Sequence, residues 1–199
     1  MKSQKEVWNN IAKEWYEFKD RPSEGTIQFL EEQKGKILDL GSGAGRHLFS
    51  IKDGKMYLAD FSKEMIKYAK EKAKEKNIDA EFSVEDFTKL SYPDNFFDGA
   101  ICTAVLHCIE GEDNRKKVVE ELYRVLKVNA RVKIDVWNKD TERFKNSPKD
   151  KSIQWRDKGN RYYYLYNEKE ILDLFKSVGF KIVEIAEPRR NIVFVAEKV

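Results

Sequence analysis

Residues 36–46 read KILDLGSGAGR, and this stretch decides the fold. The apolar run 36–40 predicts a short strand that enters a turn at Gly41. The three glycines at alternate positions lack a Cβ, so the backbone of the turn can approach a ligand closely. The apolar residues 48–51 that follow (LFSI) predict the start of a helix, whose free N–H groups would face the same ligand.

The rest of the chain alternates strand and helix patterns around this stretch. Periodicity and turn residues predict strands over 36–40, 55–60, 80–84, 97–103, 131–137, 180–186 and 191–197, and helices over 3–19, 24–33, 62–76, 113–127 and 167–178. This order predicts an α/β fold, a doubly wound and mostly parallel seven-stranded sheet that ends in an antiparallel hairpin turning at residues 187–190. We expect residues 1–199 to form a single domain, with residues 1–34 as an N-terminal helical cap and residues 138–166 as a basic and aromatic insertion.

Composition excludes several classes of protein. The 199 residues are 41% hydrophobic and include 12 Phe, 9 Tyr and 4 Trp, which excludes general disorder. The formal net charge of +3 excludes a polycation that holds nucleic acid by bulk charge alone. No apolar run approaches the roughly 20 residues that span a bilayer. The two cysteines, Cys102 and Cys108, and the two histidines, His47 and His107, do not predict a disulfide scaffold or a dedicated metal site, and the cytoplasm is the expected compartment.

Polar and aromatic residues recur where the expected parallel strands end, which is the edge at which open α/β sheets bind ligands. Asp60 ends the second strand and follows Asp39 at the spacing of the acidic residue that grips ribose hydroxyls in nucleotide sites. Asp86 can accept a hydrogen bond from an adenine amino group, and Phe87 offers an apolar wall beside it. The segment from Thr103 follows the fourth strand and reaches the same edge.

The glycine pattern narrows the class of ligand. A dinucleotide site requires Gly-x-Gly-x-x-Gly, but Arg46 occupies the position of the third glycine. A P-loop requires Gly-Lys followed by Ser or Thr, and the chain has no such motif. The sequence therefore predicts a ligand that contains adenosine without phosphates.

These motifs resemble those of the class I S-adenosylmethionine-dependent methyltransferases over nearly the whole chain. The resemblance rests on residues 38–45 (LDLGSGAG), 60–62 (DFS) with 65–66 (MI), 86–87 (DF) and 121–127 (ELYRVLK). Residues 7–12, 104–107, 136–137 and 161–166 further resemble the tRNA methyltransferases that esterify a carboxymethyl group on the wobble uridine. The chain departs from that sub-family at 21–24 (RPSE, for Arg-Lys-Pro-Trp-Pro), at Cys108 and Tyr164 (each for His), and at Ile192 (for Trp).

The resemblance implies a Rossmann-like methyltransferase fold with S-adenosylmethionine as cofactor. The cofactor residues that it implies are Tyr16, Asp39, Gly41, Ser42, Gly43, Arg46, Asp60, Phe61, Asp86, Phe87, Thr103 and Ala104. Among them, Asp60 would hold the ribose, and Tyr16 and Arg46 would close over the methionine carboxylate. Asp86 and Phe87 would hold the adenine, and the segment from Thr103 would pass near the sulfur.

On the substrate side, the catalytic candidates are His107, Arg21 and Arg161. His107 would act as a general base on a hydroxyl or amine substrate, or would only orient a carboxylate substrate, which needs no base. The two arginines would pair with an acidic group of the substrate. Stacking on a nucleobase would come from Trp137, Tyr162 and Tyr163, although three consecutive tyrosines also fit an edge strand with alternating faces.

Three functions remain open at this stage. The first is a methyltransferase acting on tRNA at a wobble uridine or a related base, for which the resemblance also implies a small zinc-binding activator subunit. Residues 139–161 carry eight basic and four acidic side chains, so they would grip phosphates or form an ordinary solvated loop. The alternatives are a small-molecule methyltransferase and a non-catalytic cofactor-binding subunit. No DNA, membrane or metal of its own is expected.

Overall fold

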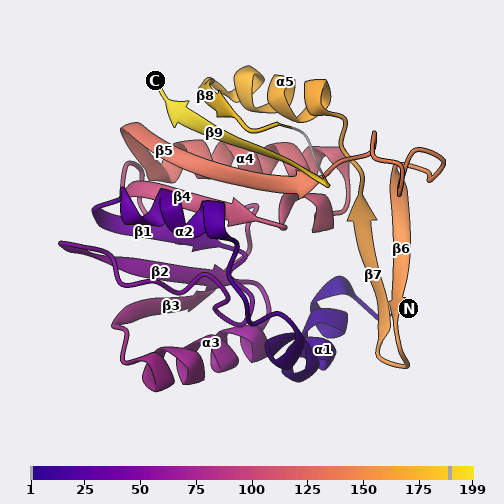
Figure 1. Ribbon diagram of the computed structural model, residues 1–199, viewed down its shortest axis with the longest axis horizontal. Coiled ribbons are helices and arrows are strands. Elements are labelled where there is room, and N and C mark those ends of the chain that lie inside the picture. Colours follow the sequence, from indigo (N-terminus) through magenta and orange to yellow (C-terminus); the bar gives the residue numbers. More distant parts are fainter. Residues whose placement is uncertain (1, 188–189) are drawn as a thin grey trace.

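The structure is a computed structural model and describes residues 2–187 and 190–199. A seven-stranded sheet of order β3-β2-β1-β4-β5-β9-β8 forms its centre (Figure 1). The strands are β1 (Gly35–Leu40), β2 (Gly54–Asp60), β3 (Ala80–Val84), β4 (Phe97–Thr103), β5 (Leu126–Trp137), β8 (Phe180–Ile185) and β9 (Asn191–Lys198). The first five are parallel, and β9 is antiparallel to both β5 and β8. The predicted fold class is therefore confirmed.

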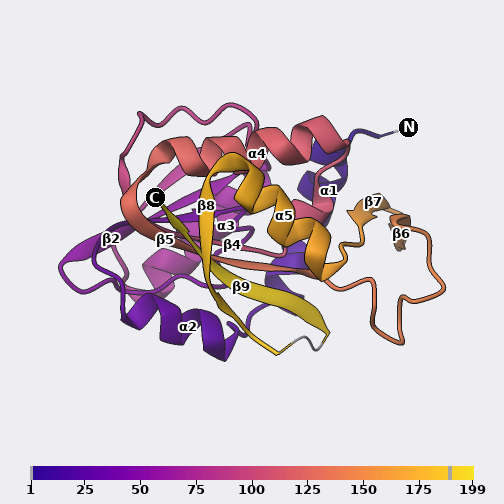
Figure 2. The ribbon, with the colours of Figure 1, turned by 90° about the horizontal axis from the view of Figure 1, so that it is seen from above.

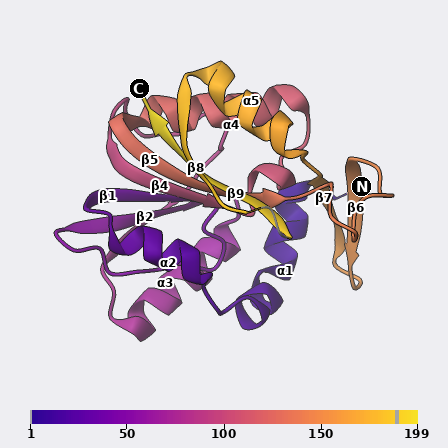
Figure 3. The ribbon, with the colours of Figure 1, turned by 45° about the horizontal axis from the view of Figure 1, so that its top comes forward.

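Helices cover both faces of the sheet. Helices α4 (Glu112–Val125) and α5 (Glu168–Val178) pack on one face, where they share a core with side chains such as Leu38 and Phe194. Helices α2 (Glu24–Glu31) and α3 (Lys63–Lys76) cover the other face (Figure 3). Each interior strand is buried on both sides, which explains why the sequence shows short continuous apolar runs there.

Helix α1 (Gln4–Phe18) lies across the carboxyl ends of the parallel strands. Its apolar stripe, including Trp8 and Ile11, packs on Ala44 of the glycine loop and on Met65 of α3. The predicted capping box is present, because the Ser3 hydroxyl accepts from the backbone N–H of Glu6 and the Glu6 carboxylate accepts from the backbone N–H of Ser3. The helix thus forms a cover over the edge at which the site residues gather.

The helix predicted to start at residues 48–51 is absent, and this expectation is wrong. Residues 41–47 are turns, and Leu48 and Ile51 pack into the core beside α2 without forming a helix. The reason is length and geometry, since the link from β1 to β2 spans only residues 41–53 and its three glycines all have positive φ. The turns of the glycine loop use residues 41–47 and leave only residues 48–53 before β2, which is less than two turns of helix. The ligand would therefore meet turn backbone rather than a helix N-terminus.

The insertion contains regular structure that its sequence did not indicate. Strands β6 (Asp150–Trp155) and β7 (Gly159–Tyr164) form an antiparallel hairpin that stands outside the main sheet, next to α1 (Figure 2). The run of tyrosines lies on β7, as the alternative interpretation of that run predicted. In the C-terminal hairpin the strands are as expected, whereas Pro188 and Arg189 of its turn lie outside the described residues.

A short 3-10 helix, η1 (Leu106–Cys108), follows β4 and carries one of the candidate catalytic residues. None of the helices in the described part of the chain is long and apolar enough to cross a membrane.

Candidate active site

In the glycine loop, residues 41–47, the three glycines have positive φ, a conformation that favours glycine. Gly41 has φ of 74°, and a Cβ there would lie 2.2 Å from a methyl carbon of Val105. Gly43 has φ of 54°, but a Cβ there would meet only Trp15, at 3.7 Å. The loop is therefore closed toward the sheet at Gly41 and comparatively open toward α1 at Gly43.

Asp60 ties this loop to the end of β2. Its carboxylate is 5% exposed and accepts hydrogen bonds from the backbone N–H groups of Gly43 at 2.8 Å and Ser62 at 2.9 Å. Burial raises the pKa of Asp60 to about 6, and these backbone donors oppose the rise. Each carboxylate oxygen can accept a further hydrogen bond, so the group can hold the loop and still meet a ligand hydroxyl.

Asp39 is a buried carboxylate without a hydrogen-bond partner. It lies in β1, is 1% exposed, and neither of its oxygens meets a donor among the described residues. Burial raises its pKa to about 7, and the nearby Arg46 only partly opposes this shift. The Ser42 hydroxyl beside it is also buried and unpartnered. A carboxylate that costs this much to bury fits a cationic ligand group that arrives from outside the fold.

Arg46 sits between two carboxylates at the edge of the sheet. Burial lowers its pKa, and the charges of Asp135 and Asp39 oppose that shift. Burial also raises the pKa of Asp135 to about 6, although Asn191 donates to it at 2.6 Å. Asp135 was not among the site residues expected from the sequence. Its only signal there was its place near the end of an expected strand. Arg46 keeps a charge within reach of an anionic ligand group.

Tyr16 is not brought to the glycine loop. Its ring stacks on Tyr68 at 5.2 Å, and its hydroxyl donates to Glu75 of α3 at 2.9 Å. The neighbouring Trp15 lies at the glycine loop instead of Tyr16, with its indole nitrogen over Gly43. One residue along a helix turns the side chain by about 100°, which separates these two positions.

The residues expected around adenine form a wall at the ends of β2 and β3. Phe87 is 4% exposed, and its ring meets that of Phe61 edge to face at 5.7 Å. Asp86 is exposed, and one of its oxygens already accepts from the backbone N–H and the hydroxyl of Thr88. The second oxygen of Asp86 is left for a ligand.

The end of β4 is strained and polar. Ala104 has φ of 62°, in the left-handed region that a non-glycine residue adopts at a cost of about 1–2 kcal/mol. Such strain clusters at functional sites. The Thr103 hydroxyl is hydrogen-bonded to His47 at 3.1 Å, and burial lowers the pKa of His47 to about 3, so this imidazole is neutral. His47 was not among the expected site residues.

His107 is held as a neutral donor. It lies on η1, is 1% exposed, and burial lowers its pKa to about 3. The backbone N–H of Trp137 donates to its Nδ1 at 3.1 Å. Because a backbone N–H can only donate, Nδ1 must be the acceptor and the proton of the neutral ring must lie on Nε2. This tautomer presents a hydrogen-bond donor, which suits orienting a substrate oxygen better than removing a proton.

The aromatic residues expected to stack on a base already pack on one another. Trp137 and Tyr163 stack with their ring centroids 4.3 Å apart, and Phe144 and His107 also stack on Trp137. The hydroxyl of Tyr162 is bonded to Asp150 at 2.5 Å on the outer strand of the hairpin. The faces of Trp137 and Tyr163 are therefore used inside the protein, where they support His107.

Arg161 is a buried cation without a carboxylate. It is 7% exposed and lies over the rings of Trp8, Trp15, Trp155 and Tyr163, at 4.6–5.9 Å from their centroids. It donates to the Tyr163 hydroxyl at 2.5 Å, while its Nε has no partner. Arg21, by contrast, is exposed between α1 and α2, and no described contact joins it to Arg161 or His107.

Four of the eight basic side chains of residues 139–161 pair with carboxylates. Glu14 of α1 pairs with both Arg156 and Lys158, and Glu170 of α5 pairs with Lys149. Lys145 pairs with Glu142 inside the insertion. These ion pairs fasten the hairpin to α1 and α5, so the insertion is an ordered wall of the site and not the loose basic loop considered from the sequence.

A family model described as a methyltransferase domain matches residues 31–185. The chain therefore belongs to this family and is an S-adenosylmethionine-dependent methyltransferase. The buried Asp39 carboxylate fits the cofactor, whose methionine part carries an amino group beside a carboxylate that Arg46 can meet.

Several relatives are similar in sequence. A tRNA (carboxymethyluridine(34)-5-O)-methyltransferase of Arabidopsis thaliana is 38% identical over 53% of this chain, a match that covers 25% of that protein. An uncharacterized protein of Methanocaldococcus jannaschii is 31% identical, with 91% of this chain and 84% of that protein covered. A tRNA (carboxymethyluridine(34)-5-O)-methyltransferase of Schizosaccharomyces pombe is 24% identical, with 97% and 95% covered.

Solved structures share the fold. An S-adenosylmethionine-dependent methyltransferase of Methanosarcina mazei has a TM-score of 0.75 at 21% identity, with 90% of this chain and 99% of that chain covered. A Burkholderia thailandensis N1-methyltransferase with bound S-adenosylhomocysteine has a TM-score of 0.71 at 18% identity, with 100% and 92% covered. A Haloferax volcanii methyltransferase in complex with its Trm112 activator has a TM-score of 0.70 at 15% identity, with 99% and 98% covered.

Proposed function

We propose that this methyltransferase esterifies a carboxylate on a modified wobble uridine of tRNA. The observation that carries the proposal is Arg161, a guanidinium that is 7% exposed, has no carboxylate partner in the described residues and leaves its Nε unbonded. Burying such a charge without compensation is costly, and a substrate carboxylate would compensate it with charge-assisted hydrogen bonds. The two similar proteins named as tRNA carboxymethyluridine methyltransferases support the same substrate class.

The bound cofactor supplies an electrophilic methyl group on a sulfonium sulfur. In this proposal, Asp39 and Arg46 bind the methionine part, Asp60 binds the ribose, and Phe61, Phe87 and Asp86 surround the adenine. The backbone of Gly41 and Gly43 leaves room for the ligand, and the segment of Thr103 and Ala104 borders the sulfur. Holding the two reactants in line is the main contribution of the protein, worth about 7–11 kcal/mol in favourable cases.

His107 orients the substrate in this proposal. A carboxylate oxygen already carries the electron pair that forms the new bond to carbon, so no residue has to remove a proton. His107 and Arg161 both contact Tyr163, whose ring centroid is 5.7 Å from that of His107 and whose hydroxyl accepts from Arg161. In this proposal each of the two groups donates to the substrate carboxylate.

The partners follow from the same proposal. Residues 1–199 act as one domain, in which residues 1–34 cover the cofactor and residues 138–166 border the substrate. A small zinc-binding activator subunit assists the enzyme in the cytoplasm, as the complex of the similar Haloferax volcanii protein with its Trm112 activator suggests.

The test is transfer of a labelled methyl group from the cofactor to tRNA that carries a carboxymethyl wobble uridine, with the same tRNA lacking that group as control. Both are assayed with and without an activator subunit. Base-labile label that depends on the carboxymethyl group supports the proposal. Label on a panel of small metabolites instead of tRNA, or cofactor binding without any transfer, would replace it with one of the alternative functions.

A further inference from the structure

One exposed aromatic side chain stands at the rim of the site. Phe18, the last residue of α1, is 66% exposed, although the helix buries its other large apolar residues. Its ring lies edge to face with that of Trp155 on the hairpin, at 6.0 Å. This exposed aromatic face lies between α1 and the hairpin, which are distant in sequence. An exposed apolar surface of this kind indicates a binding surface.

The rim adjoins both halves of the site. Trp155 packs against Trp15 at 5.7 Å, and Trp15 in turn lies over Gly43 of the cofactor loop. Trp155 also covers the guanidinium of Arg161 at 4.6 Å. A group seated on Phe18 would therefore lie one layer of side chains away from the proposed substrate carboxylate.

Positive charge surrounds this rim. Lys19 lies 5.1 Å from the Phe18 ring centroid and 5.8 Å from that of Trp15. Burial lowers the pKa of Lys19, and the charges of Arg46, Arg190 and Arg161 add to that shift. These four cations come from four separate segments, and within the described part of the chain none of them forms an ion pair with a carboxylate. The carboxylate of Glu14 on α1 is occupied by Arg156, Lys158 and the Trp155 indole.

An aromatic face with unpaired cations around it has the chemistry of a single-stranded nucleic acid site. Bases stack on aromatic side chains whatever their sequence, and the cations meet the phosphates that link them. An apolar protein partner would not require the cations, and a small anion would not require the exposed ring. The inner aromatic residues Trp137 and Tyr163 cannot take this role, because they stack on each other.

We infer that Phe18 and Trp155 form a stacking site for an unpaired nucleobase next to the one that is methylated, with Lys19 facing the adjoining phosphate. The inference rests on the proposed function, because it requires an RNA substrate. It adds a second contact on the RNA, beyond the methylated group, and it places that contact on α1 and the hairpin tip.

The experiment measures binding of an anticodon stem-loop RNA. In parallel, it measures the KM for the substrate tRNA, which carries the carboxymethyl group before methyl transfer. Phe18→Ala is expected to weaken binding about tenfold, in keeping with the loss of one stacked base. Phe18→Leu keeps an apolar surface without a π face, so it should weaken binding nearly as much, and Phe18→Trp should not. Val128→Ala is the control, because Val128 is 61% exposed at the opposite, amino-terminal end of β5.

The cations are tested by salt dependence. Lys19→Gln should lower the slope of log affinity against log salt by about 0.7, the value for one phosphate of a single strand, whereas Lys52→Gln at the other end of the sheet should not. Full affinity in Phe18→Leu, or an unchanged salt slope in Lys19→Gln, would overturn the inference. If wild-type enzyme methylates tRNA while these variants behave as wild type, the inference fails and the proposed function stands. If wild-type enzyme transfers no methyl to tRNA but still binds the stem-loop through Phe18, the proposed function fails alone.

Discussion

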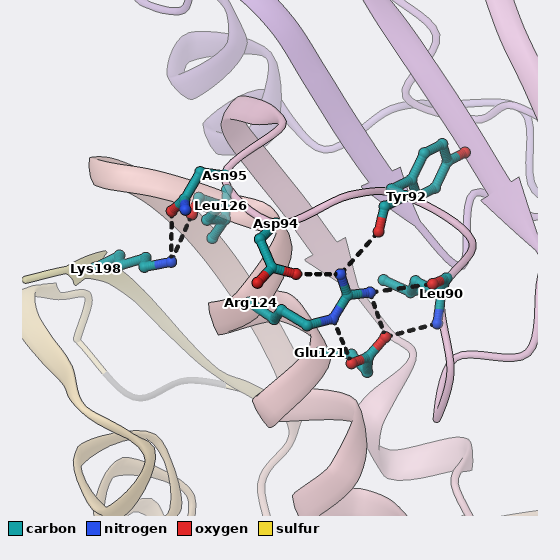
Figure 4. A network of polar contacts seen from close by, with 8 residues as sticks. All are labelled: Leu90, Tyr92, Asp94, Asn95, Glu121, Arg124, Leu126 and Lys198. Atoms are coloured by element: carbon teal, nitrogen blue, oxygen red, sulfur yellow. Dashed lines mark hydrogen bonds and ion pairs between the residues drawn. The ribbon is translucent and has the colours of Figure 1, made fainter.

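Two arginines of this protein show how differently the fold treats similar charges. Arg124, on α4, uses all five of its N–H donors, which reach Glu121, Asp94 and the carbonyl oxygens of Leu90 and Tyr92 (Figure 4). Arg161 is more deeply buried, yet it has one hydroxyl partner and an unbonded Nε. Arg124 lies at the amino-terminal end of the parallel strands, and Arg161 borders the site at their carboxyl ends.

The difference between the two arginines distinguishes groups that stabilise the fold from groups that are available to bind a ligand. The Arg124 network fastens the segment after β3 to α4, and Lys198 extends the same region by donating to Asn95 and to the Leu126 carbonyl (Figure 4). At the other end, Asp39 and Arg161 are buried, and within the described residues neither is hydrogen-bonded to a group of opposite charge. A fold tolerates such groups only where another gain offsets their cost, and ligand binding supplies that gain.

The largest effect is expected from Asp39→Asn. This change removes the charge that faces the cofactor but keeps the shape, so the affinity for S-adenosylmethionine should fall about 100-fold, or roughly 3 kcal/mol. The free energy of unfolding of the cofactor-free protein should rise at pH 8, because an unpartnered buried charge is gone. Calorimetry and urea denaturation measure the two quantities, and unchanged affinity would contradict the role of Asp39.

Arg124→Met should have the opposite pattern. Its loss removes a donor from two carbonyl oxygens and from Asp94, and it leaves Glu121 with only the backbone N–H of Leu90, so we expect the free energy of unfolding to fall by about 2–3 kcal/mol. Cofactor affinity, measured where the variant is still folded, should stay within about threefold of wild type. A large loss of affinity with normal stability would show that the two ends of the sheet are not separable in this way.

Arg161→Met is the matched substitution at the site. The apolar side chain suits a cage of aromatic rings, so thermal stability should be equal to or above that of wild type. Activity on the carboxylate substrate should fall about 30-fold in kcat/KM, or roughly 2 kcal/mol, because one charge-assisted contact is lost. Destabilisation without loss of activity would instead assign Arg161 to packing.

The smallest effect is a pH dependence of cofactor affinity. The pKa of Asp39 is raised to about 7, so its folded form holds a proton that the unfolded chain has released. The stability of the cofactor-free protein that depends on this proton is present below the unfolded pKa near 4 and is lost as pH rises through about 7. A cationic ligand group binds the charged form, so affinity should rise by up to about tenfold from pH 6 to pH 8. Asp39→Asn should lose most of this rise.

Local sequence patterns were enough to predict the sheet and the class of cofactor. Strand ends, glycines with positive φ and the spacing from Asp39 to Asp60 depend on nearby residues, and a sequence displays them directly. The helix expected after the glycine loop failed because residues 41–53 had to supply both a turn and a crossover. Of the hairpin, only the run of tyrosines on β7 was considered as a strand. The contacts of the hairpin with α1, about 140 residues earlier in the chain, are not visible in a local pattern.

The sequence by itself determined the class of fold, which follows from periodicity over short stretches, and it indicated the class of cofactor through motifs that resemble those of a known family. Only the tertiary structure decided which polar groups have partners. It turned Tyr16 toward α3 and Trp15 toward Gly43, it fixed the tautomer of His107 through the Trp137 backbone, and it left Asp39 and Arg161 unpaired. Whether a polar group has a hydrogen-bond partner depends on distances between segments that are remote in sequence, and only folding brings those segments together.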